Sequence, residues 1–319
     1  MTRPHQSALS LDLDNLWSYL MVHGDATWKD YPSYLDRVVP VALDLLAGRN
    51  LKITFFVVGI DAAMPAHREV LQSIVASGHE IGNHSHRHEP WLHRYKADDL
   101  KRELETAHEA ISAVTGEEPV GFRGPGYSVS PAGIGMLADM GYLYDASTLP
   151  TFIGPLARRY YFRSAGLTAA QRAEREFLFG QAREGLRPIK PYRWSGPGGN
   201  LLEIPVTTSP LLRLPFHPSY FLFIAERSVA LARTYVKTSL AMCSVAGVTP
   251  ALLLHPLDFL GGDEISDLKF FPGMQTDGAT KRERIGGYLD LLIDHGPVTS
   301  MNRYAAGLAR GPLKELAAF

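Results

Sequence analysis

Three histidines lie within five residues in the segment His84-Ser-His86-Arg-His88. Neutral imidazole nitrogens bind zinc and neighbouring transition metals. His84 and His88 are four residues apart, so they share one face if the chain turns helical there. His86 then points elsewhere, as an outer or surface residue. The spacing predicts that His84 and His88 bind one metal ion; the alternative is a histidine-rich loop without a specific metal.

Two aspartates, Asp12 and Asp14, end a short apolar segment that begins at Ala8. Side chains at positions i and i+2 of a strand point to the same face. Two carboxylates held close together repel each other, so a cation or an arginine is expected beside them. The alternative is a pair of solvated aspartates in a turn.

Arg123 is followed by a turn rich in glycine and proline that contains Gly126 and Tyr127. Such an arginine can order a carboxylate, and the backbone N–H groups of such a turn can bind an anion. Asp145 and His255 each follow an apolar segment that is typical of a buried strand. Catalytic residues of parallel barrels lie at the carboxyl ends of strands, so both are candidates for the site.

Taken in order, these motifs resemble those of the polysaccharide deacetylase family, also called the NodB-homology family or carbohydrate esterase family four. The sequence H-S-x-x-H is the most specific motif, and the set from Asp12 to His255 covers most of the chain. The resemblance implies a distorted (β/α) barrel with an Asp-His-His metal site. It also implies a hydrolase that removes an N-acyl group, with acetyl as the leading candidate. The substrate would be an amino sugar, or a glycan or lipid-linked intermediate that contains one.

The resemblance assigns Asp14, His84 and His88 as metal ligands and Asp12 as the catalytic base. Many members have the two aspartates adjacent, whereas Leu13 separates them here, so the assignment could be reversed. A D-x-D spacing occurs in some branches of the family.

Further roles follow from the same resemblance. Arg123 corresponds to the arginine that orients the base, and Gly126 N–H to the oxyanion donor, with Tyr127 as the neighbouring candidate. His255 corresponds to the general acid, and Asp145 to the carboxylate that tunes it.

The implied cofactor is a divalent metal, zinc first, with Co²⁺, Ni²⁺ or Mn²⁺ as alternatives. Such an ion polarises an amide carbonyl and lowers the pKa of bound water. Asp12 would take a proton from that water, and His255 would protonate the departing amine. The products would be a free amino sugar and a short acid.

Short apolar segments alternate with helical patterns along the chain. Strands are predicted at 8–14, 51–58, 80–83, 120–123, 142–146, 201–206 and 251–255. Helices are predicted at 34–47, 66–76, 98–114, 131–140 and 281–294. This alternation predicts an α/β fold with a parallel sheet and helices outside it. About seven units favour a closed or nearly closed barrel over an open doubly wound sheet.

The alternation breaks at 151–200, where a charged helical piece, 169–187, precedes a Pro/Gly-rich segment, 188–199. We interpret 151–200 as an insertion or lid over one end of the barrel, within a single domain of residues 1–319. Trp194 lies beside the Pro/Gly-rich turn. It could stack on a sugar ring of the substrate or pack in the core.

The stretch 210–224 is apolar and aromatic. It could form a lip for a lipid-linked substrate or a peripheral membrane contact. A core or subunit interface is the favoured interpretation.

Composition excludes some classes. The 319 residues carry a net charge of −1, which gives no support to nucleic acid as a partner. Cys243 is the single cysteine, so no intrachain disulfide forms. No signal-like segment is visible at the start, and no apolar stretch reaches the about 18 residues of a membrane span. We therefore expect a cytoplasmic protein.

Two other functions remain open. A cyclic-imide or ureide hydrolase could use the same scaffold, and a non-catalytic barrel could bind carbohydrate without cleaving it. Asp12, Arg123 and His255 beside the metal ligands argue against the non-catalytic barrel.

Overall fold

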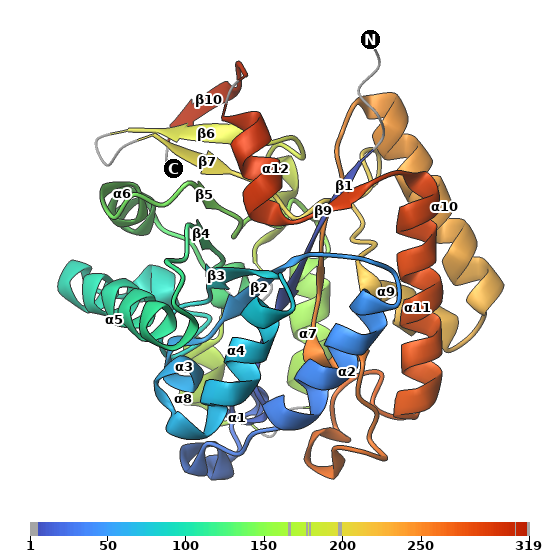
Figure 1. Ribbon diagram of the computed structural model, residues 1–319, viewed down its shortest axis with the longest axis horizontal. Coiled ribbons are helices and arrows are strands. Elements are labelled where there is room, and N and C mark those ends of the chain that lie inside the picture. Colours follow the sequence, from blue (N-terminus) through green and yellow to red (C-terminus); the bar gives the residue numbers. More distant parts are fainter. Residues whose placement is uncertain are drawn as a thin grey trace.

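The computed structural model describes residues 6–164, 167–176, 178, 180–196, 200–309 and 311–317. A sheet of mainly parallel strands forms its centre (Figure 1). Seven parallel strands lie in the order β7 (Leu201–Glu203), β5 (Tyr144–Asp145), β4 (Gly121–Phe122), β3 (Glu80–Asn83), β2 (Thr54–Val57), β1 (Ser7–Asp12) and β8 (Ala251–Leu254). Each overlaps a predicted strand, and β1 begins one residue before the predicted start.

The two outer members of this set approach each other. Thr207, just after β7, donates its backbone N–H to the carbonyl oxygen of Ala251 in β8 at 2.8 Å. The backbone N–H of Ala251 in turn donates to Thr207 Oγ1 at 2.8 Å. The sheet therefore curves until its ends meet, and the predicted distorted barrel is confirmed.

Three further strands extend this framework and were not predicted. β6 (Tyr192–Ser195) pairs antiparallel with β7, and β10 (Lys314–Ala317) pairs with β6. β9 (Val298–Thr299) pairs with the start of β1.

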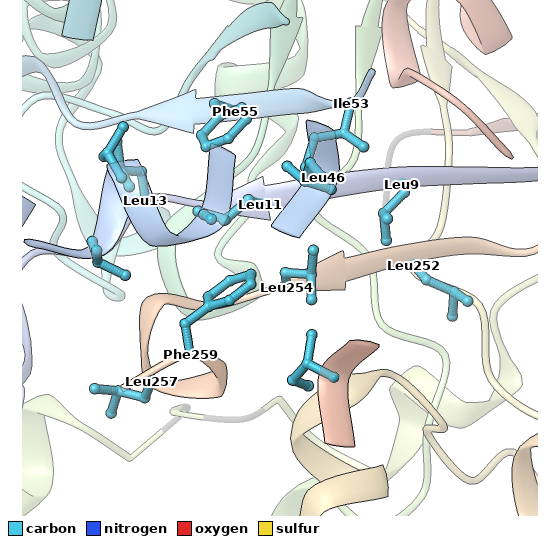
Figure 2. Packing of buried hydrophobic residues seen from close by; sticks show 14 of the residues in the cluster. Leu9, Leu11, Leu13, Leu46, Ile53, Phe55, Leu252, Leu254, Leu257 and Phe259 are labelled. Carbon is cyan, nitrogen blue, oxygen red and sulfur yellow. The ribbon is translucent and has the colours of Figure 1, made fainter. Parts of the chain in front are cut away.

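Alternation along β1 separates the two faces of the barrel wall. Leu9 and Leu11 belong to the large outer core, which also contains Phe55 and Leu254 from neighbouring strands (Figure 2). The intervening side chains point to the other face, where Ser10 contacts Arg123. The period of two that buries the leucines thus directs Asp12 into the barrel.

Helices cover the outer face of the sheet (Figure 1). The predicted helices correspond to α2 (Leu35–Ala47), α4 (Arg68–Ala76), α5 (Ala97–Thr115), α6 (Pro131–Asp139) and α11 (Gly278–His295). α8 (Ala169–Glu174) lies in the piece 169–187 that was predicted to be helical. The helices that were not predicted are α1 (Leu16–His23), α3 (Gly59–Ala63), α7 (Gly154–Ser164), α9 (Pro218–Ala225), α10 (Val229–Ala246) and α12 (Met301–Leu308).

The segment 151–200 corrects the sequence interpretation in two ways. The piece 169–187 is helical only in α8 and in a short 3-10 turn, Ala182–Leu186. The end of the segment forms β6 and extends the sheet. Its earlier parts, around α7 and α8, lie by the end of the barrel toward which β1 runs (Figure 1). Arg172, Glu176 and Arg183 are exposed, as expected for charges of mixed sign, whereas Arg175 is buried.

The apolar stretch 210–224 divides between core and surface. Phe216 and Phe221 are buried in the main core, which confirms the favoured interpretation for them. Leu211, Leu212 and Phe223 are exposed. Within the described part of the chain, no helix has the length and apolar character needed to cross a bilayer.

The core account predicts that Leu254→Ala lowers the free energy of unfolding by about 2–5 kcal/mol, because the cavity left between β8 and its neighbours cannot fully close. Leu231→Ala on α10 is the matched control, since this leucine is 58% exposed. It should change stability by no more than about 0.5 kcal/mol. Denaturant midpoints measure both, and equal losses would contradict the assignment of the core.

Candidate metal and catalytic site

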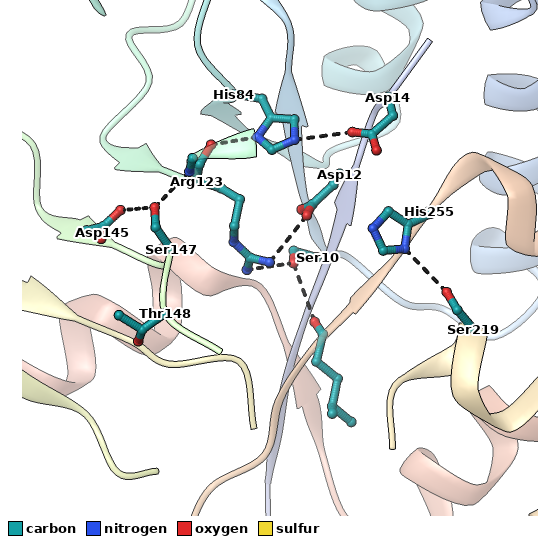
Figure 3. A network of polar contacts seen from close by, with 12 residues as sticks. Ser10, Asp12, Asp14, His84, Arg123, Asp145, Ser147, Thr148, Ser219 and His255 are labelled. Atoms are coloured by element: carbon teal, nitrogen blue, oxygen red, sulfur yellow. Dashed lines mark hydrogen bonds and ion pairs between the residues drawn. The ribbon is translucent and has the colours of Figure 1, made fainter. Parts of the chain in front are cut away.

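The predicted metal ligands lie together at the carboxyl ends of the strands. Asp14 follows β1 by two residues, and His84 follows β3 directly. Asp14 Oδ1 lies 3.2 Å from His84 Nε2 and 2.9 Å from His88 Nε2 (Figure 3 shows the His84 contact). All three side chains are buried. One carboxylate oxygen and two imidazole nitrogens that converge in this way form a donor set suited to zinc.

The histidines meet through a turn, so the expected helix is wrong. Ser85 and His88 both have left-handed backbone conformations, with φ of 64° and 54°. The side chain of Asn83 accepts the Ser85 N–H at 2.8 Å, and Ser85 Oγ accepts the His88 N–H at 3.1 Å. These side chain to backbone bonds fold the chain back and bring both rings to Asp14.

The surroundings fix the chemical state of the ligands. His84 Nδ1 donates to the carbonyl oxygen of Arg123 at 2.6 Å, which orients the ring so that Nε2 faces Asp14 and can bind a metal. Burial alone would raise the pKa of Asp14. The adjacent His88 and His84 outweigh burial and hold this pKa well below its usual value. The site therefore offers an ionised carboxylate and an oriented imidazole, which fits a divalent cation.

Asp12 pairs with Arg123 and not with the histidines. Its Oδ2 lies 3.4 Å from Nη1 of the Arg123 guanidinium. The other terminal nitrogen of the same guanidinium, Nη2, lies 3.4 Å from Ser10 Oγ (Figure 3). Arg123 is only 1% exposed, and its guanidinium lies over the Phe56 ring at 4.9 Å. Asp12 Oδ1 is buried without a hydrogen-bond partner among the described residues. This oxygen is an open acceptor next to the metal ligands.

The turn after Arg123 reaches the same cleft. Gly126 and Tyr127 have φ of 57° and 63°, so both adopt the left-handed conformation. The N–H of Tyr127 donates to Gly124 O at 3.0 Å and is already used in the turn. The Gly124 N–H donates to Ser147 Oγ at 2.7 Å and anchors the turn to the segment after β5.

His255 lies in the cleft, but its carboxylate partner is not the predicted one. The N–H of His255 donates to Asp258 Oδ2 at 2.8 Å. Ser219 Oγ donates to Asp258 Oδ1 at 2.9 Å and lies 3.4 Å from His255 Nδ1. Asp145 lies on the far side of Arg123 from His255 (Figure 3). The prediction that Asp145 tunes His255 is corrected: Asp258, three residues further on, is the adjacent carboxyl group.

Asp145 instead forms a buried pair with Glu203. Ser147 Oγ donates to Asp145 Oδ1 at 2.5 Å, and Glu203 accepts from Thr148 and from Trp194 Nε1. Burial raises the pKa of both carboxyls, and the charge of Asp145 raises that of Glu203 further, well above its usual value. Asp145 thus supports the Gly124 turn through Ser147, as a structural partner of the site.

Trp194 is a core residue. It is 1% exposed, lies in β6 and packs with Tyr192 and Leu201. The proposed stacking of Trp194 on a sugar ring is therefore corrected in favour of the core alternative. The Pro/Gly-rich turn beside it misleads because β6 is an added sheet strand whose buried side faces the core.

Most of the candidate site residues line one cleft of about 280 Å³. It is lined by Asp12, Asp14, His84, His88, Gly126, Tyr127 and His255 among others. Sequence reasoning missed four further lining residues, Tyr19, His217, Ser219 and Asp258. Burial lowers the pKa of His217 well below its usual value, so this imidazole is neutral. The spacing His255-Pro-Leu-Asp258 was a usable signal, because a side chain three residues on commonly bonds back to the backbone.

Fold and site together define a parallel α/β barrel with an Asp-His-His cluster that could hold a metal ion. The sequence model of the family described as "Polysaccharide deacetylase" matches residues 26–144, a segment that contains His84, His88 and Arg123. This match confirms the predicted resemblance to the polysaccharide deacetylase family over that segment. Asp12, Asp14 and His255 lie outside the matched segment.

Individual relatives match over shorter segments. A peptidoglycan-N-acetylglucosamine deacetylase from Bacillus cereus is 31% identical over 99 residues, 31% of this chain and 34% of the relative. A peptidoglycan deacetylase-like protein from Gibberella zeae is 34% identical over 115 residues, 35% of this chain and 31% of the relative. The chain thus spans about a third of the length of these curated relatives.

Two solved structures show the fold over nearly the whole chain. One, from Mycobacterium smegmatis, is described as a candidate polysaccharide deacetylase. It has a TM-score of 0.62 at 21% identity and covers 98% of this chain and 94% of that one. The Puue allantoinase has a TM-score of 0.57 at 17% identity, with coverages of 97% and 92%. At these identities the two structures establish the barrel fold and nothing about the reaction.

The cluster predicts that His84→Ala abolishes binding of one zinc ion per chain, because it removes one of three converging donors. His86→Ala is the control from the same turn and should keep one ion per chain. Elemental analysis gives the stoichiometry, and circular dichroism confirms that both variants fold. Stoichiometric zinc in His84→Ala would contradict the assignment.

The Asp145–Glu203 pair predicts a pH-dependent stability. Above the usual glutamate pKa of 4.5, the unfolded chain loses a proton that folded Glu203 keeps. Stability therefore falls as pH rises, by up to about 1.4 kcal/mol per pH unit. In Glu203→Gln this fall should be shallower between pH 5 and pH 8, whereas the exposed control Glu117→Gln should follow the parent. Urea unfolding at several pH values measures the slopes, and parallel slopes for Glu203→Gln and the parent would contradict the proton that folded Glu203 is expected to keep.

Proposed function

We propose that this protein is a metal-dependent hydrolase that removes an N-acyl group from an amino sugar or a sugar-containing intermediate. Acetyl is the leading candidate for the acyl group. One observation carries the proposal. Among the described residues, one buried carboxylate oxygen of Asp12 has no hydrogen-bond partner, while Arg123 contacts the other, beside the Asp-His-His cluster. A cluster that only stored or bound a metal would not need an oriented carboxylate beside it.

Asp14, His84 and His88 would hold the ion, zinc first. When bound, a divalent ion there acts as a Lewis acid and makes a bound water more acidic. The ionised state of Asp14 and the Arg123 carbonyl that orients His84 prepare the ligands for this role.

Asp12 is the proposed base. Its Oδ2 is fixed by Arg123, so Oδ1 is held in one orientation and can accept a proton from an attacking water. Arg123 remains charged and buried, and it stabilises the carboxylate before the proton arrives. This arrangement favours Asp12 as base and Asp14 as ligand over the reverse assignment.

Gly126 N–H is the proposed oxyanion donor, since the N–H of the neighbouring Tyr127 is used within the turn. One such donor is typically worth about 3 kcal/mol in the transition state. The anchor from Gly124 to Ser147 keeps the turn in place.

His255 is the proposed acid for the departing amine. Its Nδ1 faces Ser219 Oγ, which bonds to Asp258, so the ring is oriented with the other nitrogen left for the substrate. Asp258 and Ser219 are therefore positioning residues for His255. Residues 1–319 would form one catalytic domain in which the segment around α7 borders the cleft.

A substrate panel tests the reaction class. Amine release from N-acetylated and N-formylated amino sugars supports the proposal. Ring opening of cyclic imides or ureides without amine release would instead assign the protein to the cyclic-amide hydrolases. Binding of these sugars without turnover would indicate a carbohydrate-binding protein.

Asp12→Asn should lower kcat by about 10²–10⁴-fold, because a neutral amide cannot accept the proton. Zinc stoichiometry should stay at one per chain, since Asp12 is not among the converging donors. Asp30→Asn, at an exposed position, is the matched control and should keep parental kcat. Loss of zinc together with activity in Asp12→Asn would show that Asp12 is a ligand and contradict the division of roles.

A further inference from the structure

The cleft has an apolar wall as it leads away from the metal cluster. Side chains from α1, α7, α9 and the segment near α8 line it: Val22, Ile153, Ala157, Leu178, Leu222 and Phe223. None of these can form a hydrogen bond with a sugar hydroxyl. Placing hydroxyl groups against them would remove water without replacing its hydrogen bonds, which is unfavourable. The wall therefore suits alkyl groups.

Apolar character continues from this wall to the surface. Phe223 lines the cleft and is still 48% exposed. Phe152 and Leu156 flank the lining residues Ile153 and Ala157 and are 47% and 67% exposed. An apolar chain held against the wall could thus extend outward past Phe223, whose ring also lies under the Arg227 guanidinium at 5.3 Å.

The other side of the Gly126–Tyr127 turn is different. A second hollow of about 360 Å³ shares Pro90, Gly126, Tyr127 and Leu149 with the cleft. Its remaining lining is mostly polar and includes His93, Ser130, Gln181, Arg183, Glu184 and Arg187. Such groups can exchange hydrogen bonds with sugar hydroxyls. Polar and apolar spaces therefore meet at the turn that carries the proposed oxyanion donor.

We infer that the substrate is amphiphilic, with its sugar toward the polar hollow and an alkyl chain along the apolar wall. The inference rests on the proposed function and adds the substrate class. The alkyl chain has two chemical sources: the N-acyl group itself, or a lipid attached to the sugar through its anomeric oxygen. Both give the wall the same chemistry, and a substrate series separates them.

The experiment uses the zinc-loaded protein and two series. One lengthens the acyl group of N-acylglucosamine from acetyl to hexanoyl. The other keeps N-acetyl and lengthens an alkyl glycoside from methyl to octyl. In one series kcat/KM should rise about three- to fourfold per methylene until the wall is filled, because each buried methylene adds favourable transfer free energy. The series that responds identifies the source of the chain.

Phe223→Ser should flatten the rise of kcat/KM with chain length in the responding series, because this side chain lines the alkyl path. Leu231→Ser is the control, as Leu231 is exposed on α10 and does not line the cleft. Amine release that is equal across both series overturns the amphiphilic substrate and leaves the proposed function standing. Absence of amine release from every compound instead overturns the proposed function.

Discussion

The buried ion pair between Asp12 and Arg123 is the interaction on which the site depends. Two aspartates at the end of one strand repel each other inside a barrel, so each needs its own positive partner. Arg123 forms an ion pair with Asp12, and the histidines contact Asp14. Arg123 also accepts the His84 Nδ1–H through its carbonyl oxygen. One residue therefore orients both the proposed base and a metal ligand, and removing its charge would leave a buried carboxylate unpaired, at a cost of about 3–5 kcal/mol.

The order of the strands explains why residues far apart in sequence meet. β8, β1, β2, β3 and β4 are consecutive neighbours in the sheet and all run in the same direction. Their carboxyl ends therefore lie along one rim and bring Asp12, His84, Arg123 and His255 to one cleft. The same rim receives α1, α7 and α9, whose apolar side chains give the cleft its second, non-catalytic surface.

Much of this arrangement could be predicted from the sequence, because buried parallel strands and periodic helices leave strong patterns. The proposed metal ligands were recognisable by type and spacing, but the geometry of the turn that carries the histidines was not, since Ser85 and His88 are left-handed without being glycines. Asp145 was assigned to His255 from its place after a strand, whereas contact depends on tertiary packing that no local pattern records. The long helix α10 was missed because its buried face is built partly from small residues such as Ala232 and Ser239, which blur the apolar period.

The central claim is that Asp14, His84 and His88 bind one metal ion, and that the protein needs this ion to hydrolyse an amide with Asp12 as the base. Stepwise return of zinc to metal-stripped protein, with amine release from an N-acylated amino sugar as the readout, tests it most directly. The account predicts negligible activity without metal and a linear recovery that stops at one equivalent of zinc per chain. Full activity in the stripped protein, or recovery with no break at one equivalent, would contradict it.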